Sequence, residues 1–282
     1  MTRRLFTSCS VLLATAALLL SAGTAANAAS PSQAKAILTQ TNYVALGDSF
    51  ATGSGLGTYG SSGTCYRSQY SYPVVASGGT AEVTFLACNG ATTASISGQL
   101  AKFSGKTADV AYVTLTIGGN DAGFVDALTR CLKLDDCTKD AAFTGSVATK
   151  TAAVKASIAA NLAAIQAKFG SAKVIVTGYP KLFQVPSTKS LCSVGSLMSV
   201  TKAEANYLDG AAVSLNASIK AGLPAGVAYA DVATPFTGHG LCQGSSASWI
   251  NSLNILNTLG AFHPNKTGQA SGYATAVAAQ VG

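Results

Sequence analysis

The chain has 282 residues, of which 48% are hydrophobic and 10% are charged, and its formal net charge at pH 7 is +7. The basic residues are scattered, without a basic run or interleaved aromatic residues, and this excludes the pattern typical of nucleic-acid binding. We interpret the charge as surface solubility, with mild attraction to anionic head groups and a transient contact with lipid surfaces. We expect no nucleic-acid partner and a monomeric protein.

Residues 1–28 predict a signal peptide. Arg3 and Arg4 form a positive start, residues 11–20 are almost wholly apolar, and Ala26-Asn27-Ala28 offers a small-x-small cleavage site. The apolar run is shorter than the ~20 residues that a membrane span needs. We therefore expect a secreted, extracellular protein; a retained N-terminal anchor is the alternative.

The remaining chain is long enough for one core and compatible with one domain. We predict a short N-terminal extension over residues 29–40 and a single domain over residues 41–282. Five short apolar runs predict strands, and most of them end in Gly, Asn or Asp. The runs are Tyr43–Leu46, Val83–Leu86, Val110–Ile117, Lys173–Thr177 and Val227–Ala230. Such runs are typical of parallel strands buried on both faces.

Three helices are predicted between and after these strands, over residues 142–169, 202–220 and 266–280. The first has one apolar stripe, and Gly170 ends it. The stripe comprises Val147, Val154, Ile158, Leu162 and Ile165. Strands alternating with helices predict a three-layer α/β/α fold with a mostly parallel central sheet, of the flavodoxin-like kind. The segments 53–72 and 181–200 are predicted to be long loops over its carboxyl edge.

Seven cysteines indicate disulfides. Cys9 lies in the predicted signal peptide, and the even number that remains in an exported chain implies bridges, although six cysteines allow fifteen pairings. Pairing of neighbours closes the shortest loops and predicts Cys65–Cys88, Cys131–Cys137 and Cys192–Cys242. There is no Cys-x-x-Cys, and the two histidines stand alone, so we expect no metal and no cofactor.

Three polar motifs follow predicted strands. They are Gly47-Asp48-Ser49-Phe50, Cys88-Asn89-Gly90 and Gly118-Gly119-Asn120-Asp121. Ligands bind at the carboxyl ends of parallel strands, so these motifs can converge. A serine nucleophile needs a base and donors for the developing negative charge. The Asn120 amide and the N–H groups of Ser49 and Gly90 are candidate donors, although each motif alone is also compatible with a helix cap or a turn.

The base of such a hydrolase must be His239 or His263. Pro264 restricts the backbone at His263 and favours a defined extended turn. His239 lies between two glycines near Cys242, in a flexible setting. We therefore favour His263 as the base.

The chain resembles the SGNH hydrolases, also called GDSL lipases and esterases, and within them the secreted actinobacterial lipases. The resemblance covers residues 40–282 and rests on four motifs. These are Gly47-Asp48-Ser49-Phe50, Ala87-Cys88-Asn89-Gly90-Ala91-Thr92, Gly118-Gly119-Asn120-Asp121 and Phe262-His263-Pro264-Asn265. The resemblance implies that Ser49 is the nucleophile and first oxyanion donor, that Gly90 and Asn120 are the other donors, and that His263 is the base. Three sequential cysteine pairs also resemble this branch, and the segment around His239 resembles a structural one.

One departure concerns the partner of the histidine. Most of the family has an aspartate three residues before it, where this chain has Gly260, and no carboxylate side chain follows Asp231. We predict that the backbone carbonyl of Gly260 accepts the Nδ1–H of His263, which gives a Ser-His dyad. The alternative is that Asp231 orients the ring.

The sequence therefore predicts a secreted serine ester hydrolase that acts through an acyl-enzyme at Ser49. Gly-x-Ser-x-Gly is absent, so the α/β-hydrolase elbow is not used. The resemblance implies acyl esters of lipids or phospholipids, or small esters, as substrates. We expect loop residues to line the acyl site: Leu56, Tyr59, Tyr66, Tyr70 and Tyr72. The alternatives are a polysaccharide acetyl esterase and a non-catalytic binding protein on the same fold.

Overall fold

The computed structural model describes residues 42–79, 83–133, 135–196 and 198–281. The predicted signal peptide, with Cys9, and the predicted extension over residues 29–40 lie outside the described residues and stay predictions. Across the described ranges, no helix is long and apolar enough to cross a membrane.

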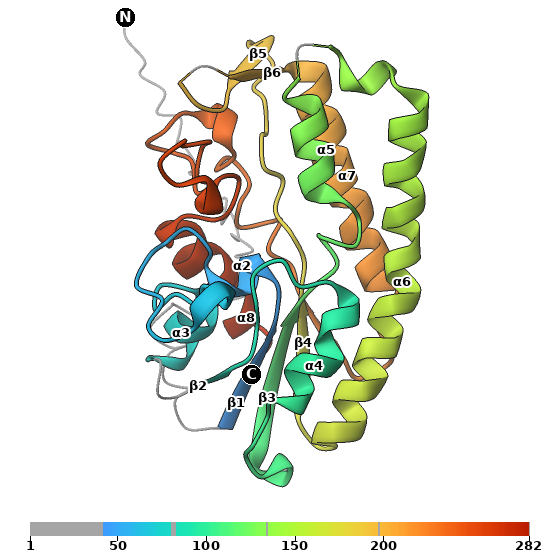
Figure 1. The fold of residues 1–282 in the computed structure, drawn as a ribbon, viewed down its shortest axis with the longest axis vertical. Coiled ribbons are helices and arrows are strands. Elements are labelled where there is room, and N and C mark those ends of the chain that lie inside the picture. The colour runs from blue at the N-terminus through green and yellow to red at the C-terminus, as the bar shows by residue number, and fades with distance from the viewer. Residues whose placement is uncertain (1–41, 80–82, 134, 197, 282) are drawn as a thin grey trace, which may run out of the picture.

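A five-stranded sheet forms the centre of the molecule, and all five strands run parallel (Figure 1). The strand order is β2-β1-β3-β4-β7. The bounds are β1 Asn42–Gly47, β2 Val83–Phe85, β3 Val110–Thr116, β4 Lys173–Thr177 and β7 Ala228–Ala230. All five predicted strands are therefore confirmed, to within one residue at every end. A separate antiparallel pair consists of β5 (Leu191–Ser193) and β6 (Ser199–Thr201).

Helices cover both faces of the sheet (Figure 1). One face carries α4 (Ile96–Ala101), α6 (Ala141–Phe169) and α7 (Lys202–Ala221), and the other carries α3 (Tyr72–Ser77) and the C-terminal helical segment. The predicted stripe of α6 is buried. The Asp140 carboxylate caps this helix by accepting from the Phe143 N–H, and Gly170 ends it. The three-layer α/β/α prediction is confirmed.

The C-terminal helix is interrupted by a π-helical stretch, Gly268–Ala274, before α8 (Thr275–Ala278). Gln269 in this stretch is fully buried. Its Oε1 accepts from the Tyr72 N–H (2.8 Å), and its Nε2 donates to the Phe50 carbonyl (3.0 Å). The irregular turn thus brings a polar side chain under the residue that follows Ser49, in line with the frequent occurrence of π-bulges near functional sites.

The three predicted disulfides, Cys65–Cys88, Cys131–Cys137 and Cys192–Cys242, are present. A short helix that the sequence pattern did not predict, α5 (Phe124–Cys131), follows the glycine-rich turn after β3 and ends at the second disulfide. Such bridges are typical of exported proteins.

Candidate active site

The turn after β1 presents Ser49. Gly47 has φ 138°, and a Cβ there would lie 2.3 Å from the Thr116 carbonyl oxygen, so the close approach of β1 and β3 requires glycine. The next N–H, from Asp48, donates to that same carbonyl at 2.9 Å. Asp48, rather than Ser49, caps the short helix α2 (Ser49–Thr52) by accepting from the Phe50 N–H at 2.9 Å. Capping therefore leaves the Ser49 hydroxyl available for other contacts.

His263 contacts this hydroxyl directly. Its Nε2 lies 2.7 Å from Ser49 Oγ, and its Nδ1 lies 2.9 Å from the Ala261 carbonyl oxygen. Because a carbonyl only accepts, Nδ1 carries the proton and Nε2 is free to accept the serine O–H. The geometry is that of a serine with its base already in place.

The partner of the histidine ring differs from the prediction. The predicted acceptor, the Gly260 carbonyl, instead accepts the backbone N–H of His263 at 3.1 Å, where it closes the turn that precedes the histidine. The ring is held by Ala261, one residue further on. The Asp231 carboxylate is exposed and accepts from Ala233 N and Thr234 Oγ1, which are its own near neighbours. The prediction of a backbone carbonyl was right in kind and wrong in residue.

The backbone around His263 is fixed by a two-stranded contact. Asn251 N–H donates to the His263 carbonyl (2.8 Å), and Phe262 N–H donates to the Asn251 carbonyl (2.9 Å). The Phe50 ring packs against the imidazole, with ring centroids 4.9 Å apart. Burial lowers the pKa of His263 below its usual value of 6.5, while the hydrogen bond to Ala261 acts in the opposite direction. The ring is therefore kept neutral, as a base must be.

Three possible donors lie beside the serine and in the turns that follow β2 and β3. Asn120 Nδ2 donates to the Ala91 carbonyl at 2.8 Å, which fixes the amide and leaves its second hydrogen available. The backbone N–H groups of Ser49 and Gly90 make no hydrogen bond within the described ranges. An unpaired N–H is expected where a ligand oxygen is to be bound.

Asp121 ties two of these turns together. Its carboxylate accepts from the Thr93 backbone N–H (3.0 and 3.1 Å to the two oxygens) and from Thr93 Oγ1 (2.5 Å). Thr93 follows Gly90 closely in the chain, and Asp121 follows Asn120. The pair therefore holds the two turns in register, and this positioning role was not foreseen from the sequence.

A second unforeseen network lies beneath Ser49. The Tyr179 hydroxyl donates to Asp48 Oδ2 (2.5 Å) and accepts from the Gly119 N–H (3.0 Å). Asn216 clamps the Tyr179 backbone from both sides, with two hydrogen bonds of 2.8 Å. Burial raises the pKa of Asp48 to about 7, against the opposing effect of its hydrogen bonds from Tyr179 and Phe50. The network links the serine turn to the turn of Asn120.

A cavity of about 340 Å³ is lined in part by Ser49 and His263. Its base includes Ser49, Asn120 and Tyr179. One side, here called the α5 wall, is made of Phe124, Val125, Leu128 and Leu132. The other side, the loop wall, is made of Leu253, Thr258, Leu259, Ala261, Phe262 and His263. An apolar cavity with a few convergent polar groups is the usual form of a site for an apolar ligand.

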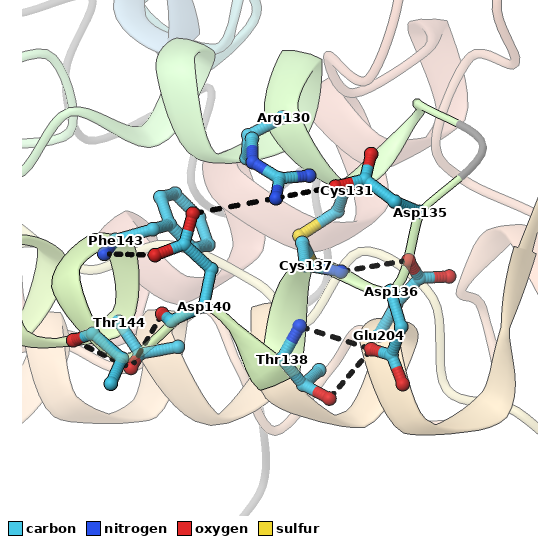
Figure 2. A network of polar contacts seen from close by, with 11 residues as sticks. Arg130, Cys131, Asp135, Asp136, Cys137, Thr138, Asp140, Phe143, Thr144 and Glu204 are labelled. Carbon is cyan, nitrogen blue, oxygen red and sulfur yellow. Dashed lines mark hydrogen bonds and ion pairs between the residues drawn. A yellow bond between two sulfur atoms is a disulfide. The ribbon is translucent and has the colours of Figure 1, made fainter.

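Figure 2 shows how the end of α5 is held. Cys131 is bonded to Cys137, whose N–H donates to Glu204 Oε1 of α7 at 3.4 Å. Arg130 Nη2 lies 2.7 Å from Asp135 Oδ2 and 3.4 Å from Asp140 Oδ2. The α5 wall is thus linked covalently and by polar contacts to the segment that starts α6 and to α7.

The predicted acyl-site residues lie elsewhere. None of Leu56, Tyr59, Tyr66, Tyr70 and Tyr72 lines the cavity. Tyr72 is fully buried, with its hydroxyl 2.8 Å from Thr116 Oγ1, because its helix packs on the sheet. Tyr59 and Tyr66 pack against each other, with ring centroids 5.3 Å apart. The prediction for these residues was wrong.

The second histidine has a structural environment. His239 Nδ1 lies 2.7 Å from the Ala247 carbonyl oxygen, and its ring stacks on Trp249 at a centroid distance of 3.8 Å. It does not line the cavity. Across the part of the chain that the structure describes, no group of three His, Cys, Asp or Glu side chains is arranged to hold a metal ion.

Comparisons with known proteins agree with this geometry. A model of the GDSL-like lipase/acylhydrolase family matches residues 45–270. The chain is 37% identical to lipase 1 of Streptomyces coelicolor over 91% of its own length and 92% of that protein, and 37% identical to a lipase of Streptomyces rimosus over 94% and 93%.

Solved structures give the same result. Phospholipase A1 from Streptomyces albidoflavus is similar with a TM-score of 0.73 and 34% identity, over 84% of this chain and 98% of that one. The extracellular lipase of Streptomyces rimosus has a TM-score of 0.68 and 33% identity, over the same shares. The chain therefore belongs to the GDSL-like lipase/acylhydrolase family and is a carboxylic ester hydrolase.

Proposed function

We propose that this protein is a secreted lipase that cleaves fatty acyl esters of glycerol or phospholipids, with Ser49 as nucleophile and His263 as base. The observation that carries the proposal is the 2.7 Å contact between Ser49 Oγ and His263 Nε2, two residues that line an apolar cavity. The three disulfides support export. A monomeric state and the absence of a nucleic-acid partner stay predictions.

Acylation begins when Ser49 Oγ attacks the ester carbonyl and its proton passes to His263 Nε2. The imidazolium that forms is stabilised by the Ala261 carbonyl at Nδ1. The oxyanion accepts hydrogen bonds from the N–H groups of Ser49 and Gly90 and from Asn120 Nδ2. One such donor contributes ~3–4 kcal/mol to lowering the barrier. His263 then protonates the leaving alcohol.

Deacylation repeats these steps with water. Neutral His263 takes a proton from the water as it attacks the acyl-enzyme, the same donors hold the second oxyanion, and the proton returns to Ser49 Oγ as the fatty acid leaves. The lowered pKa of His263 favours the neutral ring that both halves of the reaction require.

The cavity supports a fatty acyl substrate over an acetyl group. Its walls are aliphatic and aromatic side chains that an acetyl group would leave uncovered. This argues against the polysaccharide acetyl esterase. The hydrogen bond already formed between Ser49 Oγ and His263 Nε2 argues against a non-catalytic binding protein.

The test is hydrolysis of p-nitrophenyl esters from acetate to palmitate by the purified protein and by Ser49→Ala and His263→Ala variants. We expect both variants to lose at least about 10³-fold in kcat, with the wild type preferring chains longer than acetate. Ser97→Ala and His239→Gln are the controls, because Ser97 is exposed on α4 and His239 lies outside the cavity.

Two results would contradict the proposal. Activity that survives in His263→Ala and disappears in His239→Gln would move the base to His239. A wild type that cleaves only acetate esters, or none, would remove the lipase assignment.

A further inference from the structure

The turn at residues 254–257 exposes two large aliphatic side chains. Asn257 N–H donates to the Asn254 carbonyl at 3.0 Å, so the middle residues of this hydrogen-bonded turn are Ile255 and Leu256. They are 87% and 91% exposed, more than the other exposed large hydrophobic residues of the described chain. Turns favour Gly, Pro, Asn, Asp and Ser. An adjacent aliphatic pair in this position indicates a surface that is covered during function.

The turn is held in place by polar contacts. The Asn254 side chain accepts from the Leu256 N–H (2.9 Å), and Asn257 Nδ2 donates to the Gly55 carbonyl (2.8 Å). At its start, the Leu253 N–H donates to the Val194 carbonyl (2.7 Å). The turn's own asparagine side chains and the backbone carbonyls of Gly55 and Val194 therefore fix the orientation of the pair.

The pair lies close in the chain to residues that line the cavity. Leu253 and Thr258, two residues before and two residues after the pair, belong to the loop wall and line the cavity. Two residues of chain span at most about 7 Å, so the pair lies within that distance of the cavity lining. On the α5 wall, Val125 lines the cavity and is also 59% exposed. In Figure 1, α5 and the orange-red loops both stand beyond the carboxyl edge of the sheet. Exposed aliphatic side chains thus border the cavity on both walls.

The charges around this surface suit an anionic lipid layer. After Asp231 the sequence has no further carboxylate side chain, and Lys266 is the only formally charged side chain there, so no carboxylate side chain of that segment opposes the approach. Beside Val125, the Asp126 carboxylate lies 3.9 Å from Lys150 Nζ, which balances its charge. Without Arg3 and Arg4 of the predicted signal peptide, the formal charge of the chain falls from +7 to about +5, which still favours an anionic surface.

We infer that Ile255 and Leu256 form a docking tip that enters the acyl region of an anionic lipid surface and holds the cavity opening against it. The inference rests on the proposed function, because the cavity beside the tip must receive a fatty acyl chain from that same layer. A lipid layer fits both the apolar tip and the net charge. Transfer of the acyl chain then needs no passage through bulk water.

The test compares Ile255→Ser/Leu256→Ser with Leu191→Ser/Val213→Ser, which removes another exposed aliphatic pair from positions that do not line the cavity. Binding is measured by co-sedimentation with vesicles of phosphatidylglycerol and phosphatidylcholine, in a Ser49→Ala background that spares the lipid. Turnover of p-nitrophenyl butyrate in free solution is measured with Ser49 intact. A Leu256→Trp variant reports insertion by a blue shift of its added fluorescence.

We expect the tip variant to lose about tenfold or more in vesicle affinity, because two aliphatic side chains no longer leave water. The control pair should keep its affinity, butyrate turnover should be unchanged in both, and the fluorescence added by Leu256→Trp should shift only with vesicles. Equal vesicle binding by the tip variant and the wild type would overturn the inference. So would a wild-type dimer that becomes monomeric in the tip variant, because the tip would then cover a second copy. A wild type that binds vesicles through the tip but cleaves no ester would refute the proposed function alone.

Discussion

The α5 wall and the loop wall line one cavity, but they are held by different bonds. The end of α5 is fixed by the Cys131–Cys137 disulfide and by Arg130 between two carboxylates. The loop wall has a single 3₁₀ turn, Thr258–Gly260, and is held by backbone hydrogen bonds to Asn251. The loop wall also carries His263 and its acceptor, Ala261. We therefore expect the rate of ester cleavage to depend on the backbone position of the loop wall. The fit of the acyl chain should depend on the side-chain volumes of the α5 wall.

Outside the reacting residues Ser49 and His263, the largest effect on rate is expected from Gly260→Asp in the loop wall. A Cβ at this position would lie 3.0 Å from Gly55 Cα and 3.1 Å from Asn257 Nδ2, so these neighbours must already give by a few tenths of an ångström. An aspartate adds three more heavy atoms to this crowded position, and we expect the backbone that leads to Ala261 and His263 to be displaced. A shift near 1 Å in a catalytic group costs about 10²-fold in rate. We expect that loss in kcat/KM for all ester lengths alike.

Gly98→Asp is the matched control, because a Cβ there meets nothing within 4 Å. A gain in rate in Gly260→Asp would instead mean that the new carboxylate orients the histidine better than the Ala261 carbonyl does. That outcome would also remove the contrast between the walls, because a side chain, and not the backbone, would then orient the catalytic histidine in the loop wall.

A specificity change is expected from Leu128→Trp in the α5 wall. Leu128 is buried and lines the cavity, so the larger ring takes space that a long acyl chain would fill. We expect kcat/KM for palmitate esters to fall about 10- to 100-fold while that for butyrate is kept. The measurement is the ratio of kcat/KM for palmitate esters to kcat/KM for butyrate esters. Val213→Trp, on an exposed surface, is the control.

An equal loss for short and long esters in Leu128→Trp would contradict the division of labour between the walls. It would mean that α5 also positions the reacting groups, most directly through Asn120, which precedes it in the chain.

The sequence predicted the sheet well and the walls poorly, for a physical reason. Strands buried on both faces leave a local signal, a continuous apolar run, and all five such runs became strands. The eight residues of α5 are shorter than the windows of about 11–18 residues in which a helical period is read, although its buried residues, Ala127, Leu128 and Cys131, recur at helical spacing. Loop tyrosines carry no local mark that separates packing from ligand contact, and here they pack.

The site itself was predictable only where a side chain carries the chemistry. The motifs around Ser49, Asn120 and His263 mark residues that the structure brings together. The choice between the carbonyls of Gly260 and Ala261 depends on backbone dihedrals, which the residue types do not encode. Tyr179 could have been noticed, because it follows β4 closely and so lies at the same sheet edge as the other motifs.

A smaller effect, on stability, is expected from Cys131→Ala/Cys137→Ala. The bridge closes a short loop, with a sequence separation of 6, so its removal should lower the free energy of unfolding by about 2 kcal/mol. Removing Cys192–Cys242, with a separation of 50, should cost about 4 kcal/mol. Urea unfolding measures both. If the first variant also lowered butyrate turnover, the α5 wall would be shown to support the chemistry.

The smallest effect concerns pH, and it separates two titrating groups that line the cavity, His263 and Asp48. Burial lowers the pKa of His263 below 6.5, so the base is neutral above that value and kcat/KM should fall only as the pH drops below 6.5. If activity instead required ionised Asp48, whose pKa is raised to about 7, kcat/KM would begin to fall at a higher pH, near 7. We expect the acid limb of the pH profile to lie below 6.5, at the same pH for butyrate and palmitate esters, and to persist in Asp48→Asn. A limb near pH 7 that is lost in Asp48→Asn would assign the titration to the carboxyl beneath Ser49, and chemistry would then depend on the floor of the cavity as well as on the loop wall.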